Sequence, residues 1–430
     1  MNKIIKQIWN QRRMNAWIFI EIIIAGFFLW TVIDPMYVLM VNHLEDKGYE
    51  EEGRYVLNLG AFGSSHGKRD TTITNDMRKE AFYRFVQLIQ EQPEVESAYV
   101  SLHSSMPNSL SWSGGQFYPD TLAIKDKKHT HAQRYSILSV KGCDIFRTLG
   151  MKDARTGKEL TMPEDADNFC YVSELFAQKM FGSTEVIGKE VYDGTINIGK
   201  IGAVFQNVKT RDYNASYPLV IAFDKDFSMH DWVHKNNYIV FRLKEGVDFE
   251  KFNERFTKEV APHMNQGNFY FDCFKPFDET RRELGTRIGV YNKLRLKGSL
   301  AAFTLLCIFL GMVGTFWIRC NARRQEIGLM RSMGATEGRV KNQFLTEAGL
   351  LVSGAFVLSL VLVVNFVVIT DGMAQPSFSG DINSVLISEW LSPSVQFTMV
   401  SLITYLALLV IALIGTLIPV RRAVKVLPAE

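Results

Sequence analysis

Four long apolar runs set the pattern of this 430-residue chain. They cover about residues 17–40, 298–318, 348–369 and 395–420. Each is close to the roughly 20 apolar residues that a helix needs to cross a bilayer. A soluble core does not require four such runs, so the pattern predicts an integral membrane protein with four transmembrane helices.

The segment between the first two runs, residues 41–297, alternates between polar and apolar positions at two different periods. Helical spacing covers residues 76–90, and alternation typical of a strand follows at 95–102. A strand pattern at 238–243 is followed, after a short turn, by a helical pattern at 249–260. Two related α/β units on either side of an intervening segment predict one split domain of mixed α/β type.

The distribution of basic residues predicts which parts lie inside the cell. The formal net charge is only +3, but among the short segments that flank the apolar runs, residues 1–16, 319–347 and 421–430 are rich in Lys and Arg. The loop 370–394 has neither. Short basic loops stay cytoplasmic. We therefore expect both termini inside and residues 41–297 outside.

The N-terminal segment has a two-sided pattern of its own. Ile4, Ile5 and Ile8 share one face of a helix, with Lys3 and Lys6 on the other. This predicts an amphipathic helix at the cytoplasmic interface. The apolar run that follows is too long for a cleaved signal peptide.

The loop after the second run contains the most distinctive stretch of the chain, residues 323–336. At helical spacing, its apolar residues fall on one side and most of its basic and polar residues on the other. The apolar side consists of Ile327, Leu329, Met330 and Met333. The polar side consists of Arg324, Gln325, Arg331 and Ser332. A short basic helix between two membrane spans predicts a docking element on the cytoplasmic face.

This stretch also resembles a loop of the MacB/FtsX-like permeases of the type VII ABC transporter superfamily. In that family Arg-Arg-x-Glu-Ile-Gly is followed by an Ala/Ser-x-Gly-Ala turn, as in residues 323–328 and 332–335 here. Two other stretches resemble the same family. Phe181-Gly182 followed by Ile187-Gly188-Lys189 is similar to the MacB periplasmic core. Residues 419–423 match the terminal Pro-x-Arg-Arg-Ala, although Leu427 replaces the Asp that follows in the family.

The resemblance implies a fold in which four membrane helices carry a large extracytoplasmic α/β domain. That domain is expected to be porter-like, with a Sabre-like insertion at about residues 146–205. A stalk at about 279–297 is expected to run without a break into the second span.

The resemblance also implies a function: a non-catalytic permease subunit of an ABC transporter. A separate ATPase dimer would bind ATP and Mg, while this chain would bind no cofactor. Hydrolysis would move the extracytoplasmic domain by mechanotransmission and so drive efflux or translocation of a substrate. The expected residues of ATPase coupling are Arg323, Arg324, Glu326, Ile327, Leu329, Met330, Arg331, Met333 and Gly334.

Further partners follow from the same family. They are a second permease copy or a paralogue and, in some members, a periplasmic adaptor with an outer-membrane duct. The expected location is the bacterial inner membrane. The alternative is an FtsX-like regulator that activates a peptidoglycan hydrolase instead of exporting a substrate. The sequence does not identify the substrate.

Other classes of function find little support in the residues. Gly188-Lys189 is not a P-loop, because Ser183 and Glu190 stand where a Gly and a Ser or Thr are needed. No basic stripe interleaved with aromatic residues suggests nucleic acid. Two histidine pairs have spacings that suit a metal ligand set, although surface histidines are the simpler interpretation. The pairs are His129 with His131 and His230 with His234.

The polar residues within the spans are few. Glu21 is a functional candidate because it is ionisable inside a span, but it can also pair with Arg12 or Arg13 near the cytoplasmic end. Asp34-Pro35 is expected to end or kink the first span. Since the spans lack a polar lining, the sequence favours mechanical transmission over conduction. Of the five cysteines, Cys143 and Cys170 are either a pair or buried thiols.

Overall fold

The computed structural model describes residues 12–63, 66–109, 113–163, 165–227, 237–376 and 385–424. The predicted N-terminal amphipathic helix and the pair His230 and His234 lie mostly or wholly outside these ranges. The described chain forms two compact units. We call them the helical unit and the α/β unit.

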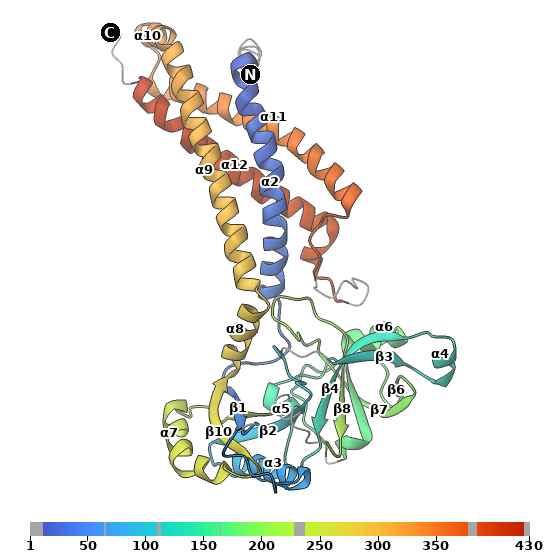
Figure 1. Cartoon of the computed structure of the whole chain (residues 1–430). Coiled ribbons are helices and arrows are strands. Elements are labelled where there is room, and N and C mark those ends of the chain that lie inside the picture. The colour runs from blue at the N-terminus through green and yellow to red at the C-terminus, as the bar shows by residue number, and fades with distance from the viewer. Residues whose placement is uncertain are drawn as a thin grey trace. The chain divides into compact units, whose positions relative to one another are not determined.

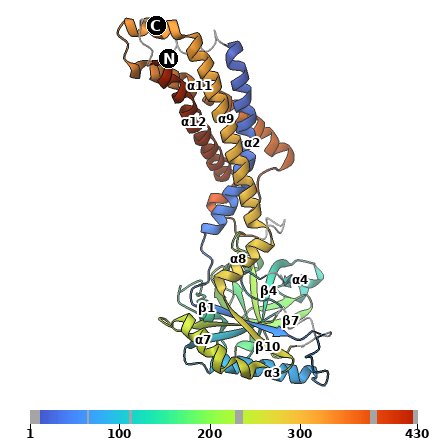
Figure 2. The same ribbon diagram turned by 60° about the vertical axis from the view of Figure 1, so that its left-hand side comes forward.

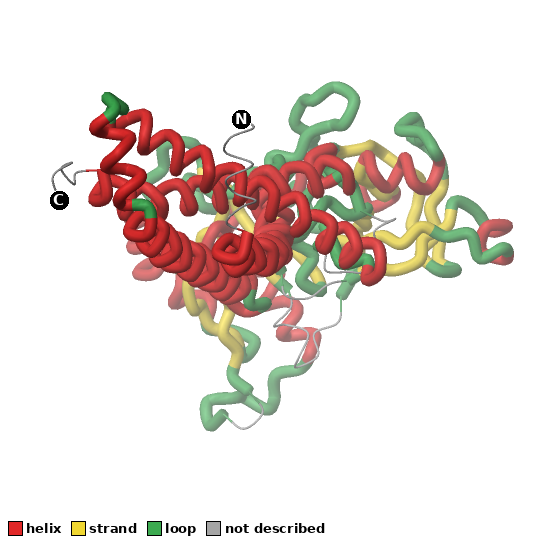
Figure 3. The backbone as a smooth tube through the Cα atoms, turned by 90° about the horizontal axis from the view of Figure 1, so that it is seen from above, coloured by secondary structure: helices red, strands yellow, loops and turns green. Residues whose placement is uncertain are grey.

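The helical unit contains four long apolar helices (Figure 1). They are α2 (Arg12–Leu44), α9 (Val290–Ala322), α11 (Glu337–Thr370) and α12 (Pro393–Val424). Each predicted span lies within one of these helices, which confirms the predicted number of apolar helices. The short helix α10 (Arg324–Ser332) lies between α9 and α11 in sequence, and the 3-10 turn η5 (Glu389–Leu391) precedes α12. Figure 3 separates the helices, in red, from the strands, in yellow.

Small residues allow the long helices to approach closely. A Cβ on Gly26 of α2 would meet the Ser359 hydroxyl of α11 at 2.7 Å. A Cβ on Gly415 of α12 would meet the backbone oxygen of Phe309 in α9 at 3.1 Å. Close contact through small residues is typical of packing between helices in a membrane.

Asp34-Pro35 does not end the first span, so that part of the expectation is wrong. Helix α2 continues through Pro35 to Leu44. Asp34 is 1% exposed, and its carboxylate accepts hydrogen bonds from Gln396 Nε2 at 2.7 Å and the Ala374 backbone N–H at 2.6 Å. Asp34 therefore ties α2 to the first turn of α12.

The α/β unit begins within the last turn of α2, at Asn42. Its strands are β1 (Arg54–Ala61), β2 (Val95–Leu102), β3 (Gly114–Tyr118), β4 (Thr130–Leu138), β5 (Phe169–Ser173), β6 (Glu190–Asp193), β7 (Ile196–Phe205), β8 (Leu219–Asp224), β9 (Tyr238–Leu243) and β10 (Phe269–Pro276). Its helices are α3 (Asn75–Gln90), α4 (Thr121–Lys125), α5 (Ile145–Leu149), α6 (Glu174–Phe181), α7 (Phe249–Glu259) and α8 (Phe277–Arg287), with 3-10 turns η1 (Ala166–Asn168) and η3 (Ala261–Met264).

Two halves of one antiparallel sheet form the split domain that the sequence predicts. The units β1–α3–β2 and β9–α7–β10 interleave in the strand order β10-β1-β9-β2. This is the order of a ferredoxin-like split βαβ pair. Both helices cover the same face, where Phe85 of α3 and Phe256 of α7 are fully buried in one core with Phe241 of β9.

The segment inserted between the two halves is wider than residues 146–205. It includes every strand from β3 to β8 and therefore spans residues 103–237. Strand β4 pairs in parallel with β8, and the remaining pairings run β4-β3-β6-β7-β5-β8, so that these six strands close into a ring. Residues 187–189 lead into the antiparallel pair β6–β7.

The expected continuous stalk is wrong. Helix α8 ends at Arg287, and α9 begins at Val290 (Figures 1 and 2). Gly289 between them has φ +76°, which a helix cannot accommodate. A positive φ suits Gly because it has no Cβ. The chain therefore turns at Gly289.

Candidate functional site

The candidate coupling region is centred on α10, a helix of 9 residues. It starts directly after α9, and it ends in a turn in which Gly334 has φ +90°. The Thr336 hydroxyl then accepts a hydrogen bond from the Arg339 backbone N–H at 3.3 Å and caps α11. Because both ends of α10 are fixed by short connections, its orientation follows from the helices beside it.

One side of α10 packs on the helical unit. Ile327 is 2% exposed and belongs to the same core as Val340 and Phe344 of α11 and Val424 of α12. Met330 is half-buried against that core. Arg331 donates to the backbone oxygen of Val424 and lies 3.7 Å from the Glu337 carboxylate. This side holds α10 in place.

A group of buried charged residues lies where α9, α10 and α11 meet. Arg319 Nη1 lies 2.9 Å from Glu347 Oε1, and Arg323 Nη1 lies 3.4 Å from Glu347 Oε2. Arg323 also bonds Glu326 through Nε at 2.9 Å. Charges out of water are tolerated only when they are paired and hydrogen-bonded. The three side chains Arg319, Arg323 and Glu347 therefore join α9, the start of α10 and α11 as one support.

The opposite side of α10 is exposed. Leu329 is 61% and Met333 is 72% exposed, and Arg324 and Gln325 lie exposed on the same helix. The apolar residues predicted to share one side thus divide, since Ile327 packs inward while Leu329 and Met333 face out. Arg323 and Ile327 are buried and are not available to a partner. Coupling through the exposed residues of α10 stays a prediction.

Glu21 lies in an apolar groove between α2 and α9. A Cβ on Gly311 would meet its carboxylate oxygen at 2.5 Å, so the missing side chain of Gly311 makes room for the carboxylate. The groove encloses about 470 Å³, and apolar side chains such as Phe28 and Phe303 form most of its wall. The side chains of Arg12 and Arg13 are outside what the structure describes, so the expected ion pair stays untested.

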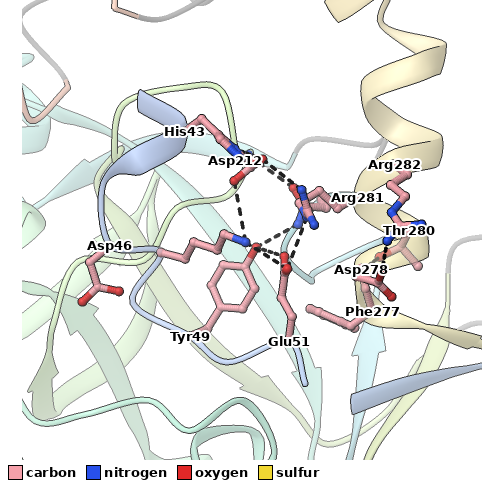
Figure 4. Close-up of polar contacts among 12 residues, drawn as sticks. His43, Asp46, Tyr49, Glu51, Asp212, Phe277, Asp278, Thr280, Arg281 and Arg282 are labelled. Carbon is pink, nitrogen blue, oxygen red and sulfur yellow. Dashed lines mark hydrogen bonds and ion pairs between the residues drawn. The ribbon is translucent and has the colours of Figure 1, made fainter. Parts of the chain in front are cut away.

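A second cluster of charges lies in the α/β unit, where the chain enters from α2 (Figure 4). Asp212 is 4% exposed and lies in the segment between β7 and β8. Its Oδ2 lies 2.8 Å from His43 Nδ1 and 3.5 Å from Arg281 Nη1, while its Oδ1 lies 3.9 Å from Lys47 Nζ. We call these residues, together with Glu51, the junction network.

Glu51 completes the junction network. Its Oε2 lies 2.9 Å from Lys47 Nζ and 3.2 Å from Arg281 Nε. Its Oε1 accepts a hydrogen bond from the Tyr49 hydroxyl at 3.2 Å. Burial, and then the negative charge of Glu51, raise the pKa of Tyr49 well above its usual value. The phenol therefore stays protonated and donates to Glu51.

The junction network joins three segments that are distant in sequence. His43, Lys47 and Glu51 lie where the chain leaves α2, whereas Arg281 lies in α8, which precedes α9. Beside it, Lys209 is 1% exposed and lies 3.4 Å from Glu45, and burial lowers the pKa of Lys209. The entry and exit segments of the α/β unit are thereby fixed to each other and to the segment that holds Asp212.

Sequence reasoning missed both charged clusters, for different reasons. Glu347 lies on the apolar stripe of α11 that includes Val340, Phe344 and Leu351, and a carboxylate on such a stripe was a usable signal. Asp212 is separated from His43 by 169 positions and from Arg281 by 69. No local pattern marks such a set.

The chain is similar to known permeases, both in its C-terminal part and over longer stretches. Residues 298–428 match the family model described as FtsX-like permease C-terminal. The macrolide export ATP-binding/permease protein MacB of Chromobacterium violaceum is 26% identical over 351 residues, which cover 76% of this chain and 48% of that protein. An uncharacterized ABC transporter permease of Methanocaldococcus jannaschii is 21% identical over 259 residues, 60% of this chain and 61% of the relative.

Solved structures of extracytoplasmic domains are also similar. The periplasmic region of MacB from Actinobacillus actinomycetemcomitans aligns over 97% of its length and 56% of this chain, with 12% identity and a TM-score of 0.34. The chain spans about half the length of the MacB relative from Chromobacterium violaceum. Residues 298–428 are thus similar to the C-terminal domain of FtsX-like permeases, and the chain, with its four apolar helices, is similar to MacB-type ABC transporter permeases.

Proposed function

We propose that this permease couples ATP hydrolysis on a separate ATPase subunit to movement of its α/β unit. The movement drives efflux or translocation of a substrate on the outer side of the membrane. The observation that carries the proposal is the two-sided arrangement of α10. One side is fixed to the helical unit by Ile327 and the buried charges, while the other exposes Leu329 and Met333.

The exposed side of α10 has the chemistry of a docking surface. Two large apolar side chains, Leu329 and Met333, are exposed, and so are Arg324 and Gln325 of the same helix. Burying two such side chains against a partner contributes about 3 kcal/mol or more. Because α10 is held by short connections, a force applied to it passes to α9 and α11 through Arg319, Arg323 and Glu347.

The junction network provides the corresponding connection in the α/β unit. It fixes the segment that follows α2 to α8, which precedes α9. In this proposal both termini lie in the cytoplasm of a bacterial cell, the α/β unit lies outside the inner membrane, and two permease chains act with an ATPase dimer. An adaptor and an outer-membrane duct are compatible with the same arrangement.

The test is an association experiment with an exposed double variant. The tagged permease is purified from its native membranes, its bound ABC ATPase is identified by mass spectrometry, and both are reconstituted in nanodiscs. We expect the double variant Leu329→Glu, Met333→Glu to bind this ATPase roughly a hundredfold more weakly and to leave its hydrolysis of Mg-ATP unstimulated. Thermal stability should not change, since both positions are exposed.

A matched control places the same charge elsewhere. Leu122 in α4 is 68% exposed, so Leu122→Glu should bind the ATPase as the unmodified chain does. If the α10 double variant bound and stimulated the ATPase normally, coupling through this helix would be wrong.

A further inference from the structure

Two histidines lie side by side on the outer face of the inserted ring of strands. His131 is in β4, and His129 directly precedes that strand. The β3–β4 register pairs Gln116 with His131 and Gly115 with Ala132. Ala132 is fully buried. Because side chains alternate along a strand, His129 and His131 share the opposite, exposed face.

The Nε2 atoms of the two imidazole rings face each other. His129 Nε2 lies 3.0 Å from His131 Nε2. His129 Nδ1 lies 3.0 Å from the backbone oxygen of Lys127. A carbonyl oxygen only accepts, so His129 Nδ1 is the donor in this contact, and the hydrogen bond between the two Nε2 atoms is then donated by His131 to His129.

This arrangement has the geometry of a metal chelate. Two nitrogens that each lie about 2.0–2.1 Å from one zinc ion are about 2.8–3.4 Å apart for angles between a right angle and a tetrahedral angle. The observed 3.0 Å lies in that range. Histidines that bind metals usually donate their other N–H to a carboxylate or a backbone carbonyl, as His129 does to Lys127.

We propose that His129 and His131 bind a divalent transition-metal ion, with Zn²⁺ as the ion to test, through their Nε2 atoms. Imidazole nitrogen suits zinc, copper and nickel. Among the described residues, no group of three or more His, Cys, Asp and Glu side chains is placed to hold a metal. The site therefore has two protein ligands and open positions for water or for a ligand from another molecule. The proposal does not depend on the proposed transport function.

The neighbouring side chains hold the pair in place. The Tyr118 ring lies beside His129, with centroids 5.8 Å apart, and the Tyr118 hydroxyl donates to Gln116 Oε1 at 3.2 Å. Gln116 is paired with His131 across the strands. The ligand atoms are thus supported from β3, and both come from one short length of chain.

The experiment uses the full chain without a polyhistidine tag, in detergent. Zn²⁺ binding is measured by calorimetry, and Cu²⁺ is added to a second sample to read nitrogen coordination by electron paramagnetic resonance. We expect one Zn²⁺ per chain at this site. His129→Gln and His131→Gln should each weaken binding by at least about tenfold, and each should lower the number of nitrogens coupled to copper in the spectrum.

Two controls separate this site from other histidines. His263 is an exposed histidine outside β3 and β4, so His263→Gln should leave binding unchanged. The double variant His230→Gln, His234→Gln tests the other sequence pair. The proposal is overturned if the unmodified chain binds no Zn²⁺, if the His129 and His131 variants bind it normally, or if only the His230 and His234 variant loses it.

Discussion

The guanidinium of Arg319 lies 2.9 Å from the carboxylate of Glu347, and each of the two side chains is 1% exposed. The pair joins the end of α9 to α11, on either side of the helix proposed to contact the ATPase. Arg323 lies against the same carboxylate at 3.4 Å. Glu347 therefore pairs with two buried guanidinium groups, those of Arg319 and Arg323.

Replacing Glu347 with Gln should strongly destabilise the helical unit. The change removes the carboxylate that faces the buried Arg319 and leaves Arg323 with Glu326, and breaking a buried pair in this way costs about 3–5 kcal/mol. Thermal unfolding of the purified chain in detergent measures the effect. Glu326→Gln is the control, because Glu326 also contacts Arg323 but is 64% exposed, and an exposed pair contributes at most about 1 kcal/mol. Equal unfolding temperatures for the two variants would contradict the assigned role of Glu347.

The junction network makes a similar prediction for the α/β unit. Asp212→Asn removes the charge that faces His43, Lys47 and Arg281, and it leaves Glu51 as the remaining carboxylate of the network. We expect a loss of about 3–5 kcal/mol of folding free energy, measured by chemical unfolding of the full chain.

The control for Asp212 lies close by in the sequence. Asp46 is exposed, and in Figure 4 its side chain points away from Asp212. Asp46→Asn should therefore change stability by less than about 1 kcal/mol. A loss in Asp212→Asn no larger than in this control would show that the network does not hold the entry and exit segments together.

The sequence predicted the four membrane helices and the two halves of the split domain because each rests on a strong local period. It could not predict which apolar residues of α10 pack inward. Ile327 and Leu329 are similar in polarity, yet one is 2% and the other 61% exposed. If an amphipathic helix packs on its own chain and also contacts a partner, both sides carry apolar residues. The sequence pattern does not tell which of these residues face the same chain and which face the partner.

The closed ring of strands was missed for a different reason. It depends on the parallel pairing of β4 with β8, whose partners Gln133 and Leu219 are far apart in sequence. Parallel pairing across a long connection leaves no turn signal between the strands. The predicted insertion was therefore too short at both ends.

The orientation of the chain gives a labelling prediction. Lys251 in α7 has an 85% exposed side chain, and Ser332 at the end of α10 is also exposed. In a background without the five native cysteines, Lys251→Cys should react with an impermeant thiol reagent added to intact spheroplasts. Ser332→Cys should react only after the membrane is permeabilised. The reverse result would place α10 outside the cell and exclude contact with a cytoplasmic ATPase.

The break between α8 and α9 leads to a prediction about Gly289. An isolated Gly within a helical pattern is usually tolerated, so the sequence alone favoured one continuous helix. In the structure the N–H groups of Ile288 and Gly289 bond back to Leu284 and Thr286, which closes α8, and Gly289 takes φ +76°. An L-residue in that conformation costs about 1–2 kcal/mol. Gly289→Ala should therefore lower the thermal stability of the chain.

Gly298 in α9 is the matched control, because a Cβ at either glycine would meet no atom within 4 Å and only Gly289 has a positive φ. Gly298→Ala should raise stability by about 0.5–1 kcal/mol, as in other helix interiors. The two variants should thus shift the unfolding temperature in opposite directions. If Gly289→Ala were also stabilising, residues 277–322 would be able to form one helix, and force would pass along a rigid rod. Opposite shifts would show that Gly289 keeps its positive φ in the folded chain, so that α8 and α9 are two separate helices.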